Sequence, residues 1–371
     1  MNRTTTLLLI LSSVLATGST LVTGAAGAEP QESSLERLGL RFDAAVVARY
    51  DDNIIQLSDE DIARLEQGPP SSRFRITTPD DWVGIARFDG RWRHSIFSRR
   101  ETRLHAGADV YRYHTNGIKD WEEYKLDWDQ ELTASRKHLV SLRVTGELVS
   151  DFYLRELTDD DASFAAGRRI RNSARYDQTS LSATLEREMI ENRLTVELDW
   201  KRADRDYVPD FDERDGLRTD WRVEARVRPV GHSRLRFDLQ LSTGDYAARG
   251  DLASTPVPDD DISYDFDGAK LRAALPWGER SRGRVEVDLE YERRDFTTTN
   301  QFDLFRYGRV DDRWEYALKV AQFLGHGLDL SAEWRRRSND ATFPPTVVPQ
   351  DDVTDYDENR FELGLRARFG S

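Results

Sequence analysis

Charged side chains recur at every second position in several segments of the sequence, and they offer its most evident chemistry. In the segment 82–92 they are Arg87, Asp89 and Arg91. Guanidinium groups bind carboxylates and hydroxyl-bearing solutes through planar sets of hydrogen bonds. Such a ladder could therefore line a path for anionic or hydroxylated solutes. The same residues could instead form ion pairs that only hold the shape of a wall.

Similar ladders occur along the whole chain, and their acidic and basic side chains nearly cancel. Neighbouring strands could then pair opposite charges across a shared wall, so the two interpretations are compatible. The side chains that we expect to line the path are Arg87, Asp89, Arg91, Asp127, Asp129, Arg222, Glu224, Arg226, Glu286, Asp288 and Arg366.

Other kinds of chemistry find little support in the sequence. The chain has no cysteine, which excludes disulfides and thiolate metal sites. The adjacent His232 and Ser233 lie in an expected tight turn, and no Gly-x-Ser-x-Gly, His-Glu-x-x-His or phosphate-loop motif occurs. The net charge of −14 argues against nucleic acid as a partner. We predict no enzyme activity, no cofactor and no metal site.

Several acidic clusters fall in the expected loops. They are Asp51-Asp52, Asp159–Asp161, Asp259–Asp261 and Asp351-Asp352. Carboxylate clusters can bind Ca²⁺, but no EF-hand spacing is present. A solvated acidic surface is therefore the expected state, with calcium binding as the alternative.

Period-two alternation identifies the elements that must position the charged ladders. In 82–92 the even positions Trp82, Phe88 and Trp92 are apolar, which is typical of a β-strand with one apolar face. The tenth segment of this kind changes parity near Gly268, where we expect a β-bulge. The fourteen segments are 38–50, 82–92, 104–110, 124–132, 140–152, 179–185, 194–200, 221–227, 235–241, 264–277, 285–291, 314–320, 328–334 and 361–369.

The apolar parity carries essentially no charge through the centre of each segment, as contact with lipid requires. Beyond residue 28 there is no run of about twenty apolar residues, so only a closed barrel could span a bilayer. Trp82 and Trp92 are separated by about 33 Å along a strand, which a tilt of about 40° reduces to the height of an apolar band. The aromatic residues expected at the lipid interfaces are Trp82, Trp92, Trp200, Trp221, Trp277, Trp314, Trp334 and Phe369.

The start of the chain has the layout of a secretory signal peptide, with Arg3, an apolar stretch and Ala26-Gly-Ala28. We expect residues 1–28 to be a cleaved leader, 29–37 a short periplasmic segment and 38–371 the barrel. Short connections such as 278–282 alternate with long ones such as 51–81, which is typical of periplasmic turns and extracellular loops. Within 51–81, Ser58 to Gly68 predicts a capped helix. It could fold into the lumen or away from it.

The end of the chain, Phe361-Glu-Leu-Gly-Leu-Arg-Ala-Arg-Phe369, resembles the signal by which barrel-assembly machinery recognises outer-membrane proteins, although Gly370 and Ser371 follow it. The segment Ala48-Arg-Tyr-Asp-Asp-Asn53 resembles the end of strand one in Gram-negative porin-like barrels of unassigned substrate. These resemblances imply a location in the outer membrane, contact with its lipid and lipopolysaccharide, and assembly through the last strand.

We therefore predict an all-β fold, a closed antiparallel transmembrane barrel of fourteen strands. Its expected function is passive diffusion of small hydrophilic solutes, anionic or saccharide. The alternative is a non-conducting barrel that acts as an anchor or as a surface-assembly component.

Overall fold

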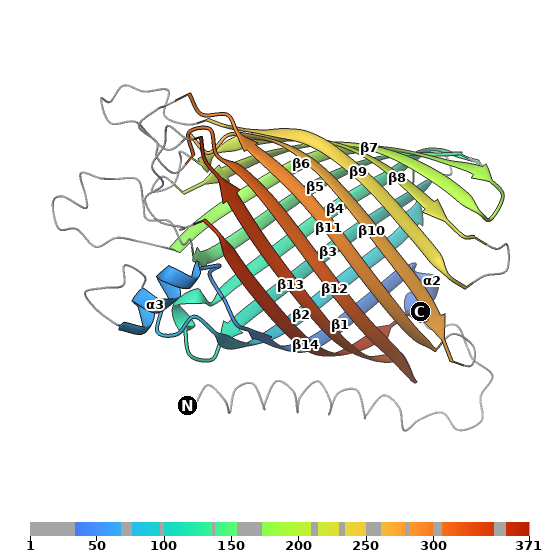
Figure 1. Cartoon of the computed structure of the whole chain (residues 1–371). Coiled ribbons are helices and arrows are strands. Elements are labelled where there is room, and N and C mark those ends of the chain that lie inside the picture. The colour runs from blue at the N-terminus through green and yellow to red at the C-terminus, as the bar shows by residue number, and fades with distance from the viewer. Residues whose placement is uncertain are drawn as a thin grey trace.

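The computed structural model describes residues 34–67, 76–96, 100–135, 138–153, 173–208, 214–229, 234–249, 261–278, 282–299, 306–344 and 354–370. These residues form fourteen antiparallel strands that close into one barrel, as predicted (Figure 1). Closure is made by β1, which pairs with both β2 and β14, and every other strand pairs with its neighbours in sequence. The expected leader at 1–28 lies outside the described residues.

The strands are β1 (Leu40–Asp51), β2 (Asp81–Ser95), β3 (Glu101–Tyr113), β4 (Trp121–Ala134), β5 (His138–Tyr153), β6 (Ser173–Ile190), β7 (Leu194–Tyr207), β8 (Gly216–Val227), β9 (Arg236–Ala248), β10 (Tyr264–Trp277), β11 (Gly283–Phe296), β12 (Val310–Gly325), β13 (Leu328–Thr342) and β14 (Tyr356–Phe369). The helices are α2 (Ser34–Arg37), α3 (Asp59–Gln67) and the 3-10 turn η1 (Gly117–Lys119). No helix among the described residues is long and apolar enough to cross a membrane.

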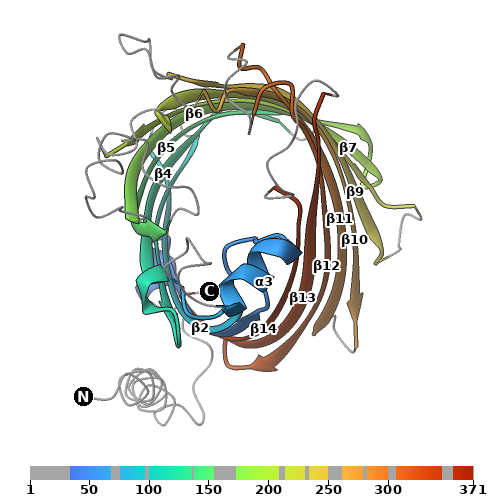
Figure 2. The same cartoon turned by 60° about the vertical axis from the view of Figure 1, so that its left-hand side comes forward.

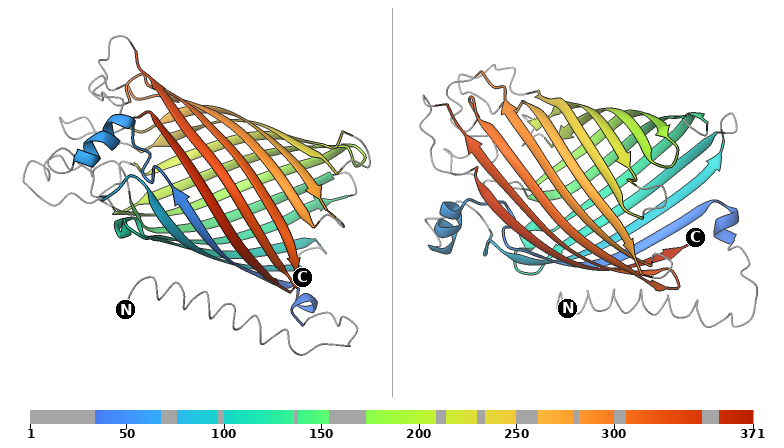
Figure 3. Two further views of the ribbon diagram at one scale, coloured as in Figure 1. Left: turned by 60° about the horizontal axis from the view of Figure 1, so that its bottom comes forward. Right: turned by 45° about the vertical axis from the view of Figure 1, so that its right-hand side comes forward.

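The connections at the two ends of the barrel differ in length. At one end β12 and β13 are joined by His326 and Gly327, whose φ angles of 51° and 75° lie in the left-handed region that a tight hairpin needs. This end also holds α2 and the end of β14, whereas α3 lies at the opposite end (Figure 3). The strand ends joined by the longer connections 52–80 and 297–309 lie on the side of α3, although 114–120 on that side is short. In barrels of this kind the short-turn end faces the periplasm.

Several strands are longer than their alternating cores predicted. The segment 194–200 is only the first part of β7, which continues to Tyr207. The missed part has charged outward residues, Arg202, Asp204 and Asp206, so it lacks the apolar parity by which the strand was identified. The strands therefore project beyond the lipid-facing band at the extracellular end.

The β-bulge expected near Gly268 is wrong. β10 pairs without a register shift with both β9 and β11 from Tyr264 onward. Leu271 and Leu275 are exposed on its outer face, while Phe266 is buried on its inner face. The change of parity in the sequence thus marks the height at which the aromatic side chains move from the lipid side to the lumen side.

The outer face of the barrel is an apolar band. Large apolar side chains remain widely exposed on strands far apart in the ring, including Leu126 of β4 at 61%, Leu241 of β9 at 57% and Leu363 of β14 at 58%. Soluble proteins rarely expose a contiguous apolar surface of this extent. The band is the surface that contacts lipid.

Candidate functional site

The side chains that we expected to line a path lie on the strand parity opposite to the apolar band. On β8, Arg222, Glu224 and Arg226 alternate with the exposed Trp221 and Val223. Residues paired across adjacent strands face the same side of the wall, so the lumen-facing positions of one strand identify those of the next strand around the barrel. By the same criterion the lumen side holds Arg87, Asp89, Arg91, Asp127, Asp129, Glu286, Asp288 and Arg366.

Ion pairs between adjacent strands hold many of these charges. The Arg222 Nε donates to Asp199 of β7 at 2.9 Å. In the same way the Arg272 Nε of β10 donates to Asp288 of β11 at 2.6 Å. Because such pairs join neighbouring strands, they fix the position of each guanidinium on the wall. The wall is therefore both ionic and pre-ordered.

His105 of β3 joins two carboxylates on the strands beside it. Its Nε2 lies 2.7 Å from Asp89 of β2 and its Nδ1 lies 2.9 Å from Asp127 of β4. The Thr145 hydroxyl donates to the other oxygen of Asp127 at 2.6 Å. Both ring nitrogens are engaged with carboxylates, so His105 links β2 and β4 across β3.

The aromatic residues expected at the lipid interfaces lie on the outward parity. Trp200 and Trp221 are neighbours on β7 and β8, with 6.4 Å between ring centroids. At the periplasmic end the Trp92 indole N–H donates to the Leu38 carbonyl at 3.1 Å. The other outward aromatic residues of the set are Trp82, Trp277, Trp314, Trp334 and Phe369.

Above Trp200 and Trp221 the strand ends form an extracellular collar, which consists of 173–178, 201–207, 216–220, 244–248, 264–267 and 293–296. Its inner face was not predicted from the sequence. It carries Tyr176, Tyr207, Tyr246, Tyr264, Phe266 and Phe296, each on the lumen parity. The one available signal was the change of parity in 264–277.

Arginine side chains cover the rings of the collar. The Arg218 guanidinium lies 4.4 Å from the Phe266 ring centroid, and the Arg205 guanidinium lies 4.8 Å from that of Tyr176. These are the distances of cation–π contacts. The collar therefore presents guanidinium groups to the lumen on an aromatic support.

The described parts of the connection 52–80, residues 52–67 and 76–80, are here called loop one, and they fold onto the inner wall of the mouth. Its residues Ile54, Leu57 and Leu65 pack against lumen-facing side chains that include Val83 and Ile85. Figure 2 shows α3 at the mouth, beside β2 and β14. The sequence left open whether this connection folds into the lumen or away from it, and its apolar residues pack on the lumen side.

The predicted helix of loop one is present as α3. The Ser58 hydroxyl accepts a hydrogen bond from the Asp61 amide at 3.2 Å, as the N-cap prediction required. The helix ends at Gln67, one residue before the predicted Gly68, which lies outside the described residues.

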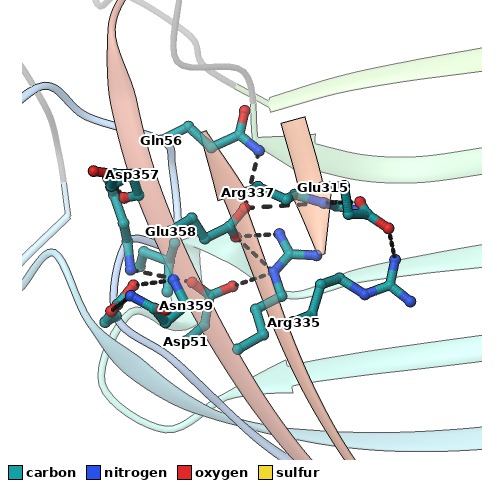
Figure 4. Close-up of polar contacts among 12 residues, drawn as sticks. Asp51, Gln56, Glu315, Arg335, Arg337, Asp357, Glu358 and Asn359 are labelled. Carbon is teal, nitrogen blue, oxygen red and sulfur yellow. Dashed lines mark hydrogen bonds and ion pairs between the residues drawn. The ribbon is translucent and has the colours of Figure 1, made fainter. Parts of the chain in front are cut away.

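The Tyr-Asp-Asp-Asn segment fastens loop one to β14 (Figure 4). The Asn53 amide nitrogen donates to the carbonyls of Leu57 and Asp357 at 2.7 and 2.8 Å. Asp51 accepts from the Arg360 Nε at 3.0 Å. Asp51 is therefore engaged in an ion pair that joins the end of β1 to β14.

A buried carboxylate lies at the base of loop one. Glu358 is 0% exposed and accepts from the Arg360 Nε at 2.5 Å and from the Gln56 amide at 3.2 Å. Nearby, Lys119 of η1 donates to the Ile54 carbonyl. Burial lowers the pKa of the Lys119 ammonium group to about 8. Charged groups from β14 and from η1 thus hold the same segment of loop one.

Metal and catalytic candidates are few in the described part of the chain. There, no group of three or more His, Asp or Glu side chains is arranged to hold a metal ion. The pair His232-Ser233 and the clusters Asp159–Asp161 and Asp351-Asp352 lie outside the described residues.

Comparisons with known proteins find likeness in structure only. No protein-family model matches the chain, and no curated protein sequence is similar to it. Among solved structures, the outer-membrane channel DcaP of Acinetobacter baumannii is 10% identical with a TM-score of 0.48, covering 89% of this chain and 96% of that one. OccAB3 of the same organism has 10% identity, a TM-score of 0.43 and coverage of 89% and 99%. OprD of Pseudomonas aeruginosa has 11% identity, a TM-score of 0.41 and coverage of 89% and 95%.

The location of the chain follows from its own architecture. A closed barrel satisfies every strand by pairing and leaves no open edge. Its apolar outer band, flanked by outward aromatic residues, is the surface of a transmembrane barrel. The chain is a closed transmembrane barrel of fourteen strands, the architecture of outer-membrane proteins.

Proposed function

We propose that the chain is an outer-membrane channel through which small hydrophilic solutes diffuse. The observation that carries this proposal is the exposure of lumen-facing charges along the strands. Lys125 of β4, Arg222 of β8 and Lys319 of β12 keep 40%, 41% and 43% of their side chains exposed. These strands are spaced around the ring, so the exposure is not confined to one wall. A lumen filled by side chains would bury them.

The finer part of the proposal concerns the charge of the solute. A guanidinium has five N–H donors, and a pair with one carboxylate leaves some of them free. Arg222 and Arg272 are each paired on one side and 41% and 37% exposed. Such groups can donate to the oxygens of passing anions or sugars. We therefore propose anionic or hydroxylated solutes as the favoured class.

The alternative of a non-conducting anchor or assembly barrel is kept because of loop one. Loop one covers the β1 to β3 side of the mouth, and the collar lines the β6 to β11 side. An entrance partly covered by loop one would suit a selective channel as well as a closed barrel. Electrical recording separates the two functions.

The decisive test is planar-bilayer recording of the purified, refolded chain in KCl. We expect stable single-channel steps and a reversal potential, under a KCl gradient, on the side that indicates anion preference. The Arg222→Gln variant should lower this preference, while Arg202→Gln, on the outward face of β7, should not. Complete absence of stable conductance from correctly folded protein would overturn the channel and favour the anchor.

A further inference from the structure

Arginine residues lie directly opposite each other at three places in the register of the described strands. The pairs are Arg41 with Arg91, Arg93 with Arg103, and Arg335 with Arg360. All three pairs face the lumen. Like charges at directly opposed positions destabilise a sheet. Each pair therefore marks a position at which the wall requires a compensating negative charge.

Carboxylates of the chain compensate two of these pairs. Arg93 and Arg103 share the carboxylate of Glu101, which lies 3.1 Å from the Arg93 Nε. In the pair of Arg335 with Arg360, each arginine is bound by two carboxylates, those of Glu315 and Glu333 on one side and those of Asp51 and Glu358 on the other. Acidic side chains of the barrel therefore hold both pairs together.

The pair of Arg41 with Arg91 lacks this compensation. Arg91 is exposed and forms no hydrogen bond or ion pair with any other described residue. Arg41 lies 3.4 Å from Asp43, but Arg366 of β14 binds the same carboxylate at 3.2 Å. The Arg41 Nε has no hydrogen-bond partner. One carboxylate thus serves two arginines, and Arg91 has none.

The other acidic side chains beside Arg91 in the described wall are engaged with His105. Asp89, two residues before Arg91 on the same face, lies 2.7 Å from the His105 Nε2. Asp127 lies 2.9 Å from the Nδ1 of the same ring. Even when Asp89 is counted, three arginines share two carboxylates in this part of the wall. An anion from solution can supply the missing charge.

The uncompensated pair lies at the periplasmic end of the lumen and is open to water. β1 begins and β14 ends at the side of the short turns (Figure 3). The side chains of Arg41 and Arg366 are 34% and 37% exposed, and that of Arg93, nearer to the rim, is 68% exposed. A solute in the lumen can therefore reach these guanidinium groups.

We propose that Arg41 and Arg91 form a subsite for the phosphate group of a small solute at the periplasmic end of the lumen. A phosphate group carries a charge of roughly −1.5 to −2 at neutral pH and three acceptor oxygens. Its tetrahedral oxygens can accept from two guanidinium groups at once, whereas the planar carboxylate is matched by a single one. The subsite rests on the proposed channel, because it specifies which anions that channel would favour.

The test is the interruption of KCl current by inorganic phosphate in single channels of the full-length refolded protein. We expect phosphate to act at concentrations at least about tenfold lower than acetate, which carries one carboxylate. Arg91→Gln and Arg41→Gln should each weaken the effect by about tenfold, the scale of one lost charged hydrogen bond. Arg91→Lys keeps the charge but loses the planar pair of donors, so its effect should be intermediate.

Arg284→Gln is the matched control. It removes a lumen-facing arginine from the same end of the barrel, four strands away on β11, and this arginine is already bound by Glu286. Its phosphate response should equal that of the wild type. Heat-modifiable gel migration of each variant checks that its barrel is folded.

Other results would overturn the subsite. Equal potency of acetate and phosphate would reject the phosphate class, and an unchanged response in Arg91→Gln would remove that residue from the site. Glycerol 3-phosphate carries the same group, so its potency relative to inorganic phosphate distinguishes a phosphorylated solute from the free ion as the ligand. If the protein does not conduct, the proposed channel fails, but calorimetric titration of phosphate into the detergent-solubilised barrel still tests the subsite. Absence of binding there, with the wild type folded, would reject it.

Discussion

Truncation of Leu57 tests whether loop one controls the current. Leu57 is 1% exposed and lies in the cluster that packs loop one on the inner wall. Leu→Ala at a buried site costs about 3 kcal/mol, within a range of about 2–5. Because about 1.4 kcal/mol corresponds to tenfold in a population, Leu57→Ala should raise the undocked fraction of loop one by about a hundredfold. A wider entrance or frequent switching between two conductance levels should follow.

The assay is single-channel recording, with hydrogen exchange of the loop-one amides as an independent measure of docking. Leu57→Met keeps the volume and should stay close to the wild type in both measurements. Leu239→Ala removes the same atoms from the lipid face of β9, where the side chain is 48% exposed, and should leave the current unchanged. If Leu57→Ala exchanges faster in loop one and yet conducts as the wild type does, loop one does not limit the current.

Three further results are expected. Folding lowers the pKa of Lys119 from 10.5 to about 8, so the unfolded state binds more protons between these pH values. The docking of loop one should therefore strengthen by up to about 3 kcal/mol as the pH rises from about 8 to 10.5. In the Lys119→Met variant, hydrogen exchange of the loop-one amides should lack this pH dependence. Glu358→Gln removes a fully buried carboxylate from two arginines and should destabilise the barrel by about 3 kcal/mol in urea unfolding. As a control, Glu60→Gln breaks an exposed ion pair with Arg64 and should change the free energy of unfolding by less than about 0.5 kcal/mol. Leu239→Arg on the outer face of β9 should cost about 2–4 kcal/mol in vesicles, whereas Gln240→Arg on the lumen face of the same strand should cost far less, and equal effects would contradict the orientation of the wall.

The number and order of the strands could be predicted because lipid imposes a strict rule on one parity. Every second residue of each strand must be apolar where it meets the bilayer. The rule stops at the upper aromatic residues, so the collar of β7 beyond Trp200 was missed. In β10 the same rule turned an ordinary strand into an expected bulge, since Tyr264 and Phe266 were assumed to face the same side as Leu271.

The inward direction of loop one had a signal in the sequence that alternation alone did not use. Val47, Val83 and Ile85 occupy lumen positions on two adjacent strands, where polar residues are the rule. Apolar side chains facing a water-filled lumen are unfavourable unless something covers them. The apolar residues of loop one, Ile54 and Leu57, provide that cover. The sequence does not predict which residues of loop one contact which residues of the wall, because these contacts form only once the ring of strands is closed.

The ion pairs of the charged ladders both stabilise the wall and reduce the attraction between the wall and a charged solute. An arginine paired with a carboxylate, as Arg272 is with Asp288, keeps spare donors but little net charge. A solute can exchange hydrogen bonds with such a wall without being trapped by it. Where no carboxylate compensates a lumen-facing cation, an anion should stay longer.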